Sequence, residues 1–420
     1  MSREMKNSGV PWLKDIPSNW NVERGKNVLV LQKRPVRESD DVVTCFRDGE
    51  VILRSLRRTE GFTMSDKEIG YQGINEGDIV IHGMDGFAGA MGVSKSTGKG
   101  SPVLVVCSPK YDAIPQYIIY YLRALAMTDV FIALATGIRE RSCDLRWNKI
   151  SELEFILPSS IEQQKIASFL DRKCAEIDEM IAMQEKIVEE LKAYKQSVIT
   201  EAVTKGLNPD VPMKDSGIEW IGEIPEHWKV DLLSLLFEEH KQKNTGLLCK
   251  NLLSLSYGKI VRKNIDSVGG LLPQSYDGYN IVDKGDIVFR LTDLQNDKKS
   301  LRTGLVRERG IVTSAYVTLR SRKPVLSAYY QYLFHSYDVM KVFYGMGDGV
   351  RQGMNYGDLR KMLIVTPPHS EQNEIVEFLD TKCTEIDNLI SIKLSKIDSL
   401  KEYKKSIIYE YVTGKKEVTE

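Results

Sequence analysis

The sequence is poor in the residues that build metal centres and disulfide scaffolds. Its 420 residues include six cysteines and five histidines, and no two cysteines have CxxC spacing. This argues against zinc ribbons and disulfide-stapled folds and favours a reducing cytoplasm. No group of His, Asp and Glu has the spacing of metal ligands, so we expect no metal bound by this chain.

Long apolar runs and an excess of either charge are also missing. No stretch reaches eighteen apolar residues and the first five residues lack an apolar core, so we expect no membrane span and no signal peptide. The 58 basic and 58 acidic residues cancel, but residues 1–157 are net +1, 158–212 net −3, 213–365 net +5 and 366–420 net −3. The excess of positive charge outside the two acidic stretches is compatible with nucleic-acid binding.

Two long stretches without internal glycine or proline predict two long helices. They follow Pro158 and Pro367, match each other at an offset of 209, and are rich in good helix formers. From Glu162 to Lys205 such a helix has 44 residues and a length of ~66 Å. Alternating steps of four and three predict the seam of a coiled coil, with the other copy as the obvious partner. The predicted seam residues are Leu170, Cys174, Ile177, Ile181, Val188, Leu191 and Val198 in the first helix, and Leu379, Cys383, Ile386, Ile390, Ile397, Leu400 and Ile407 in the second.

Polar residues interrupt this seam at matching places. Gln184 corresponds to Lys393 and Lys195 to Lys404, both at an offset of 209. A polar residue in a seam costs stability and fixes register or partner. Two interpretations stay open: the breaks set the register, or they are inherited from a duplication.

The repeat extends beyond the helices. Ser8-Gly9-Val-Pro-Trp12 matches Ser216-Gly217-Ile-Glu-Trp220, and Gly77-Asp-Ile-Val matches Gly285-Asp-Ile-Val, at an offset of 208. One module of about 210 residues therefore occurs twice. We predict domains at 1–157 and 213–365, with a long helix and linker at 158–212 and a second long helix at 366–420. The interiors, 40–110 and 240–320, share little, which suggests two domains doing one job on different targets.

Each globular part has the pattern of a mixed α/β fold. Strands are predicted at Val42–Phe46, Asp78–His82, Val103–Cys107, Glu154–Leu157, Asp286–Arg290, Gly304–Val306 and Ala315–Leu319. Amphipathic helices are predicted at Pro115–Ala126 and Ser327–Tyr337. Their tyrosines are predicted to be packing residues rather than base-stacking platforms.

No catalytic motif is complete. Thr366-Pro-Pro-His369 resembles the tetrapeptide of amino-methyltransferases, but its first and last residues differ, and it fits a helix start. The stretch Gly92 to Gly100 resembles a phosphate-binding loop, but it has five residues between glycines and no Ser or Thr after the lysine, so we interpret it as a loop.

The chain resembles the specificity (S) subunit of type I restriction-modification enzymes. The motifs that carry this resemblance are Asp215-Ser-Gly-Ile-Glu-Trp220 with Pro225-Glu-His-Trp228, and Pro367-Pro followed by Glu371-Gln372 at the start of a long helix. Their first-half counterparts differ slightly, since Pro158-Ser-Ser replaces the double proline. The resemblance covers essentially the whole chain.

The resemblance implies α/β target-recognition domains that each contact one half of a split, asymmetric DNA site. The two long helices would pair antiparallel, act as a spacer and bind two methyltransferase subunits, which carry S-adenosylmethionine. Two motor-nuclease subunits, which use ATP and Mg, would join for restriction. The S subunit itself would bind no cofactor and catalyse nothing, in the cytoplasm of a bacterium or archaeon.

Basic residues in the variable interiors are the candidates for DNA contact, because Arg and Lys bind phosphates and guanine edges. They are Arg54, Arg57, Arg58, Lys95, Lys99, Arg139 and Arg141 in the first copy, and Lys259, Arg262, Lys263, Arg290, Lys298, Lys299, Arg302 and Arg351 in the second. Two alternatives are kept: a self-contained DNA methyltransferase or nuclease with duplicated recognition domains, and a coiled-coil scaffold without a DNA role.

Overall fold

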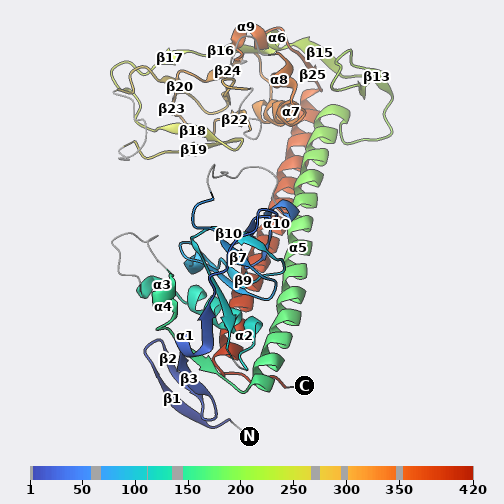
Figure 1. The fold of residues 1–420 in the computed structure, drawn as a ribbon. Coiled ribbons are helices and arrows are strands. Elements are labelled where there is room, and N and C mark those ends of the chain that lie inside the picture. The colour runs from blue at the N-terminus through green and yellow to red at the C-terminus, as the bar shows by residue number, and fades with distance from the viewer. Residues whose placement is uncertain are drawn as a thin grey trace. The chain divides into compact units, whose positions relative to one another are not determined.

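A computed structural model describes residues 3–57, 68–110, 112–134, 145–265, 275–294, 301–346 and 353–419. The chain forms two compact units (Figure 1). Unit 1 comprises Met1–Glu185 and Ser395–Glu420, and unit 2 comprises Lys186–Leu394. The long helices α5 (Ser160–Lys205) and α10 (His369–Val412) each contribute residues to both units.

Apart from the long helices, unit 1 consists of short strands and helices. Its strands are β1 (Met5–Val10), β2 (Leu13–Pro17), β3 (Asn21–Arg24), β4 (Leu29–Leu31), β5 (Val43–Cys45), β6 (Val51–Leu53), β7 (Gln72–Ile74), β8 (Ile79–His82), β9 (Met91–Val93), β10 (Gly98–Gly100), β11 (Leu104–Pro109) and β12 (Glu154–Leu157). Its helices are α1 (Gly25–Val28), α2 (Pro115–Met127), α3 (Val130–Ala133) and α4 (Trp147–Ile150), with 3-10 turns η1 (Arg54–Leu56) and η2 (Gly86–Ala88).

An antiparallel sheet of order β4-β11-β8-β9 lies at the centre of unit 1. Successive side chains of a strand point to opposite faces. Ile79 and Ile81 of β8 therefore join the large core that includes α2 and the long helices. Val80 between them joins a smaller core with Val43 and Val51 of the β5–β6 hairpin.

Unit 2 repeats this architecture with different details. Its strands are β13 (Met213–Asp215), β14 (Glu223–Pro225), β15 (Lys229–Leu232), β16 (Phe237–Glu239), β17 (Gln242–Lys243), β18 (Leu253–Ser256), β19 (Lys259–Arg262), β20 (Asn280–Val282), β21 (Ile287–Phe289), β22 (Thr303–Leu305), β23 (Gly310–Val312), β24 (Val317–Ser321) and β25 (Leu363–Thr366). Its helices, besides the long ones, are α6 (Leu233–Leu236), α7 (Ser327–Val339), α8 (Val342–Met346) and α9 (Tyr356–Leu359).

The central sheet of unit 2 has the order β16-β24-β21-β22, which corresponds strand for strand to that of unit 1. Ile287 and Phe289 join the core with α7 and the long helices, while Val288 joins a second core with Leu253. The two copies seen in the sequence therefore have the same strand order in the central sheet. In both, one face of the sheet packs against the core with the long helices and the other face packs against a smaller core.

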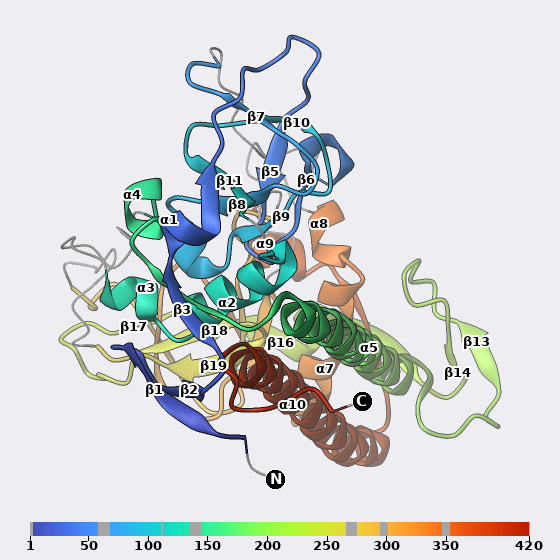
Figure 2. The same cartoon turned by 60° about the horizontal axis from the view of Figure 1, so that its bottom comes forward.

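Within each unit, the portions of α5 and α10 lie side by side and run in opposite directions (Figure 2). In unit 1 the Phe169 and Tyr411 rings contact each other at a tilt of 41°, with their centroids 4.5 Å apart, and Asp178 pairs with Lys404 at 2.6 Å. Residue numbers that rise along α5 therefore meet numbers that fall along α10. In unit 2, Lys195 of α5 pairs with Asp387 of α10 at 2.7 Å.

These two ion pairs are the same pair seen twice. Adding 209 converts Asp178 into Asp387 and Lys195 into Lys404, so each pair maps onto the other with the two helices exchanged. Each unit therefore contains the same contact between the long helices, with the roles of α5 and α10 exchanged. Both seam lysines thus have acidic partners on the opposite helix, which supports the register-setting interpretation of these breaks.

The predicted seam residues lie on the inner faces of the helices. Ten of the fourteen are buried, and the other four, Ile181, Leu191, Val198 and Ile390, are half-buried. In unit 1, Leu170 and Leu400 belong to one core, and in unit 2, Leu379 and Cys383 belong to the other. The seam therefore also forms part of each domain core.

The predicted fold class, two mixed α/β domains with two long antiparallel helices, is confirmed. The sequence-based domain limits stay predictions, whereas the compact units divide both long helices. One strand lies later than predicted, because Thr313 to Tyr316 forms a turn before β24: the Tyr316 amide donates to the Thr313 carbonyl at 3.1 Å.

Acid is expected to destabilise unit 2 through His335 of α7, whose side chain lies beside Gln196 of α5 at 3.1 Å. Burial, followed by the nearby Lys195 charge, lowers the pKa of His335 to about 4. In the unfolded chain the histidine takes up a proton near pH 6.5. The neutral, buried His335 therefore makes its full contribution to the unfolding free energy above pH 6.5, and this contribution is lost as the pH falls to about 4. We expect a loss of about 3 kcal/mol at ~1.4 kcal/mol per pKa unit.

Unfolding free energies at pH 7 and pH 4.5, for the wild type and His335→Gln, test this expectation. Glutamine keeps a hydrogen-bonding group but cannot be protonated in this range. The variant should lose less stability in acid than the wild type. Equal losses of unfolding free energy in the two proteins would show that His335 does not contribute to the acid sensitivity of unit 2.

Candidate nucleic-acid interface

The Glu-Gln pair that opens each long helix fastens that helix to its domain. The indole of Trp20 donates to Glu162 at 3.0 Å, and the indole of Trp228 donates to Glu371 at 2.9 Å. Both tryptophans are fully buried, so each indole N–H has to find an acceptor inside the protein. This explains why both copies carry a tryptophan 142 or 143 residues before the glutamate.

The glutamine that follows is buried and bridges two backbone groups. Gln163 accepts from the Ile114 amide at 2.9 Å and donates to the Pro158 carbonyl at 2.9 Å. Gln372 does the same with the Leu326 amide at 3.2 Å and the Pro367 carbonyl at 2.9 Å. Ile114 and Leu326 cap α2 and α7, so one side chain joins the starts of two helices.

Replacing Gln163 with Ala is expected to cost about 1–3 kcal/mol, because it leaves a buried N–H and a buried C=O without partners. Gln164→Ala is the matched control, since that neighbour is exposed and bonds only within its own helix, to Ser168. We expect it to change stability by less than about 0.5 kcal/mol. Chemical denaturation measures both, and equal effects would contradict the bridging role.

The tyrosines of α2 and α7 are packing residues, as predicted. Tyr117 donates to the Val412 carbonyl of α10 at 3.1 Å, and Tyr329 donates to the Val203 carbonyl of α5 at 2.8 Å. Both rings are fully buried. Tyr120 donates in the same way to Asp171. Stacking on bases is therefore excluded for Tyr117 and Tyr329.

Each long helix ends against the domain of the other copy. Gly206, just after α5, has φ +78°, and a Cβ there would lie 3.2 Å from the Trp228 ring. Gly414, just after α10, has φ +72°, and a Cβ there would lie 2.4 Å from Pro17 and 3.1 Å from Trp20. Glycine meets both the left-handed conformation and the close approach.

In unit 1 the described basic candidates lie on the hairpin and loops beside β5 and β6, and each has a partner. Arg57 pairs with Asp48 and with Glu50 at 2.9 Å, and Lys95 pairs with Glu50 at 3.2 Å. Arg54 donates to Thr44 at 3.1 Å, and Lys99 pairs with Glu68 at 2.8 Å. The remaining candidates of the first copy lie outside the described residues: Arg58, Arg139 and Arg141.

In unit 2 three of the described candidates lie at the β18–β19 hairpin. Lys259 and Lys263 are exposed at β19, and Arg262 between them pairs with Glu308. Arg290 follows β21 and is half-buried. Three further candidates lie outside the described residues: Lys298, Lys299 and Arg351.

Arg302 corrects the expectation of DNA contact. It is fully buried, and its guanidinium donates to the Thr292 carbonyl at 2.9 Å and the Asp293 carbonyl at 3.3 Å, while its amide bonds to Asp338. A side chain held in this way stabilises the interior of unit 2 and does not reach the DNA. The sequence offers no sign of this, because Arg302 lies among exposed-looking basic residues.

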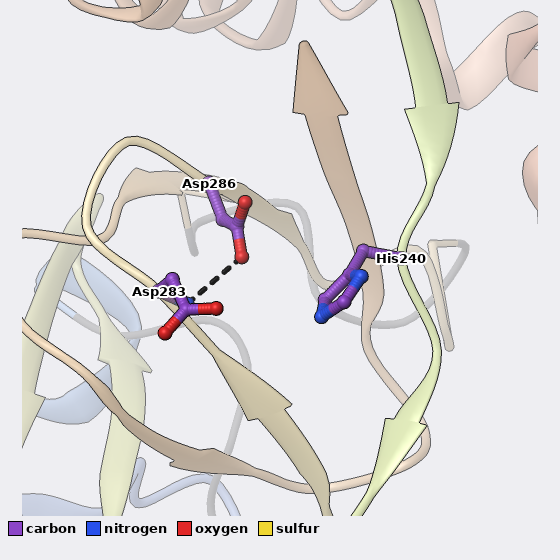
Figure 3. A group of neighbouring side chains, drawn as sticks. All are labelled: His240, Asp283 and Asp286. Atoms are coloured by element: carbon purple, nitrogen blue, oxygen red, sulfur yellow. Dashed lines mark hydrogen bonds between the residues drawn. The ribbon is translucent and has the colours of Figure 1, made fainter. Parts of the chain in front are cut away.

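A cluster of His240, Asp283 and Asp286 has the composition of a metal site (Figure 3). Arg320 already occupies it, since its guanidinium contacts Asp283 at 2.7 Å and Asp286 at 2.7 and 2.8 Å. These bonds raise the pKa of Arg320. Asp286 also accepts the Asp283 amide at 2.9 Å, which closes the turn of the Gly-Asp-Ile-Val motif. The two aspartates therefore form the turn between β20 and β21, and Arg320 neutralises their charge.

The glycine-rich stretch that resembles a phosphate-binding loop is partly strand, which corrects its interpretation as a loop. Its ends belong to β9 and β10. A Cβ on Gly92 would lie 2.0 Å from the Gly49 carbonyl oxygen, and one on Gly98 would lie 2.4 Å from that of Asp41. Close packing of strands accounts for these glycines.

Comparison with known proteins gives a consistent result. The "Putative type I restriction enzyme MjaX specificity subunit" of Methanocaldococcus jannaschii is 24% identical over 425 residues, covering 96% of this chain and 94% of that protein. The type I restriction enzyme MjaVIII specificity subunit of the same organism is 24% identical, covering 95% and 93%. This chain is a homologue of type I restriction enzyme specificity subunits. The resemblance found in the sequence motifs is thereby confirmed.

Solved structures of specificity subunits share the fold. A chain from a structure of type I R-M complex assembly and conformational transition aligns with a TM-score of 0.71 at 14% identity, covering 95% of this chain and 99% of that one. The HsdS subunit from Thermoanaerobacter tengcongensis aligns with a TM-score of 0.52 at 14% identity, covering 95% and 98%. No protein-family model matches the sequence. Among the described residues, no helix combines the length and the apolar character that crossing a bilayer requires.

Proposed function

We propose that this chain is the DNA sequence-recognition subunit of a type I restriction-modification complex, with each unit contacting one half of a bipartite site. The observation that carries the proposal is the reciprocal pair of Lys–Asp bridges, Asp178–Lys404 and Lys195–Asp387. A chain whose two halves repeat the same helix contacts suits two half-sites about one helical turn, ~34 Å, apart. The helices α5 and α10, which both units share, act as the spacer between the half-sites.

The two half-sites differ in sequence. The scaffolds of the units agree in sheet order and in the Trp–Glu and Gln bridges, but the corresponding hairpins β5–β6 and β18–β19 differ in loop length and charge. Two recognition domains that share a fold but present different side chains to the DNA select different bases. The recognised site is therefore asymmetric.

Exposed apolar residues on the long helices support docking of two copies of one partner. Three of the exposed apolar residues on the long helices of each unit match those of the other unit at an offset of 209: Met180, Met183 and Tyr403 in unit 1, and Leu389, Ile392 and Tyr194 in unit 2. Residues three apart share a helix face. Two equivalent surfaces of this kind suit two methyltransferase subunits.

The chemistry belongs to the partners in this proposal. S-adenosylmethionine is carried by the methyltransferase subunits, and ATP and Mg by two motor-nuclease subunits. This chain supplies sequence recognition and positions the methyltransferases on the DNA. It is not itself an enzyme.

Mapping methylated bases in DNA from cells that express this chain with its methyltransferase tests the proposal. We expect methylation at one split, asymmetric motif, which disappears when this chain is omitted. Methyl transfer by the purified chain alone would favour the self-contained enzyme instead. Absence of DNA binding in the presence of the methyltransferase would favour the scaffold.

A further inference from the structure

The positive charge of unit 2 is concentrated in one segment. Residues 240–265 contain six Lys or Arg and no Asp or Glu, while the whole stretch 213–365 is only net +5. The corresponding residues 32–57 of unit 1 contain six basic and five acidic residues. A polyanion would therefore bind this segment of unit 2 far more strongly than its counterpart in unit 1.

This segment ends in a rigidly seated hairpin. Strands β18 and β19 pair from Leu253–Arg262 to Ser256–Lys259. Leu253 and Leu255 are buried. A Cβ on Gly310 would lie 2.5 Å from Leu253, so the hairpin lies directly against β23. Its position on unit 2 is thus fixed by core packing.

The tip of the hairpin carries an aromatic residue that packing does not explain. Tyr257 is 81% exposed, with φ +47°, and Gly258 follows with φ +76°. Two-residue turns with positive φ at both positions favour Asn or Asp followed by Gly. A tyrosine there is strained, and such strain is found mainly at functional positions.

The outer face of the hairpin beside this tip carries hydrogen-bonding groups. Ser256 pairs with Lys259 across the strands, and Ser254 with Val261, so both hydroxyls and the ammonium lie on the face opposite Leu253 and Leu255. Lys259 is exposed. This face therefore combines a cation, two hydroxyls and an exposed ring.

The corresponding hairpin of unit 1 is different. Its loop, between Cys45 and Val51, is five residues long. Arg57 lies over the Phe46 ring at 4.2 Å and is paired with Asp48 and Glu50, so the ring is covered and the cation is neutralised. An exposed ring on a hairpin free of acid is thus a property of unit 2.

We propose that the β18–β19 hairpin is the DNA-contacting element of unit 2, with Lys259 and Lys263 on phosphates and the Tyr257 ring against a base. The inference rests on the proposed function and names the contact surface within it. Duplex DNA is the occupant because its phosphates complement the charge, an exposed ring stacks on or wedges between bases, and hydroxyls bond to base edges. Unit 1 contacts its half-site by other means.

The substitution Tyr257→Asn tests the role of the ring in DNA binding without destabilising the turn. Asparagine is favoured at this turn position, so the variant should be at least as stable as the wild type. We expect binding to the mapped duplex, measured with the methyltransferase present, to weaken about tenfold, within the range of a lost base-stacking contact. Tyr257→Phe keeps the ring and should bind like the wild type.

The lysines are tested through salt dependence. Lys259→Ala with Lys263→Ala should lower the slope of log Kd against log salt by about 2, because each lysine that contacts a phosphate contributes about 1. Lys323→Ala with Lys361→Ala, at exposed lysines of unit 2 away from the hairpin, is the matched control and should leave the slope unchanged.

The outcomes separate this inference from the proposed function. If the wild type binds its site and the hairpin variants bind equally well, the hairpin assignment is wrong and the proposed function stands. If the hairpin and control lysines change the salt dependence of binding equally, the positive charge of unit 2 attracts DNA without a localised contact. The assignment of the hairpin as the DNA-contacting element then also fails. A wild-type complex that binds no duplex overturns both.

Discussion

A chain that lacks residues 181–187 and 390–396 is expected to recognise a DNA site whose gap is about three base pairs shorter. The two heptads correspond at an offset of 209, and each contains one polar break of the seam. Removing seven residues shortens a helix by about 10 Å, and base pairs are stacked ~3.4 Å apart. A whole heptad keeps the seam in phase.

The deletion also preserves the interhelical pairing. Asp178 and Lys195 lie on either side of the first heptad, and Asp387 and Lys404 on either side of the second, so both ion pairs form again. We expect methylation of the original site to fall to background and methylation of the shortened site to appear. Methylation sequencing on a library of gap lengths measures this.

Deleting the heptad from α5 alone is the control. The helices then differ in length, one ion pair is lost and seam residues face the wrong partners, so the protein should lose stability without gaining a new site. If the doubly deleted chain keeps the original gap, the helices do not determine the spacing.

Arg302→Ala is expected to destabilise unit 2 by about 3–5 kcal/mol. The substitution removes a fully buried guanidinium, so the carbonyls of Thr292 and Asp293 lose their charged donor and a cavity replaces the side chain. The bond to Asp338 comes from the backbone amide and is kept. Denaturant unfolding followed by circular dichroism measures the change. DNA binding at temperatures where the variant is folded should be little affected.

Arg262→Ala is the matched comparison. Arg262 pairs with Glu308, but both side chains are substantially exposed, so solvent screening keeps the contribution of the pair to stability small. Similar losses for Arg262 and Arg302 would contradict the structural role assigned to the buried arginine.

The sequence predicts those parts of the fold that depend on periodicity and repetition. The heptads give both long helices within two residues, because a seam needs regular spacing over many turns. The motifs around Trp20 and Glu162 show that something is repeated, but their hydrogen bond joins residues 142 apart and becomes visible only in the fold.

The basic candidates are where sequence reasoning is weakest. Composition cannot separate Arg302, which is buried, from Lys259, which is exposed, because both are basic residues of the same variable interior. The one signal that could have singled out the β18–β19 hairpin is local: Tyr257-Gly258 between alternating apolar residues, in a segment without acids.

The division of the helices between the units also affects the order of assembly during translation. Unit 2 is one uninterrupted segment, whereas unit 1 needs Ser395–Glu420, which leaves the ribosome after all of unit 2. Domains generally fold as their residues emerge, with the N-terminal domain first. Here unit 2 has all its parts before unit 1, so unit 1 stays incomplete until Ser395–Glu420 has been made. A premature stop after Leu394 therefore damages the unit that contains the first 185 residues.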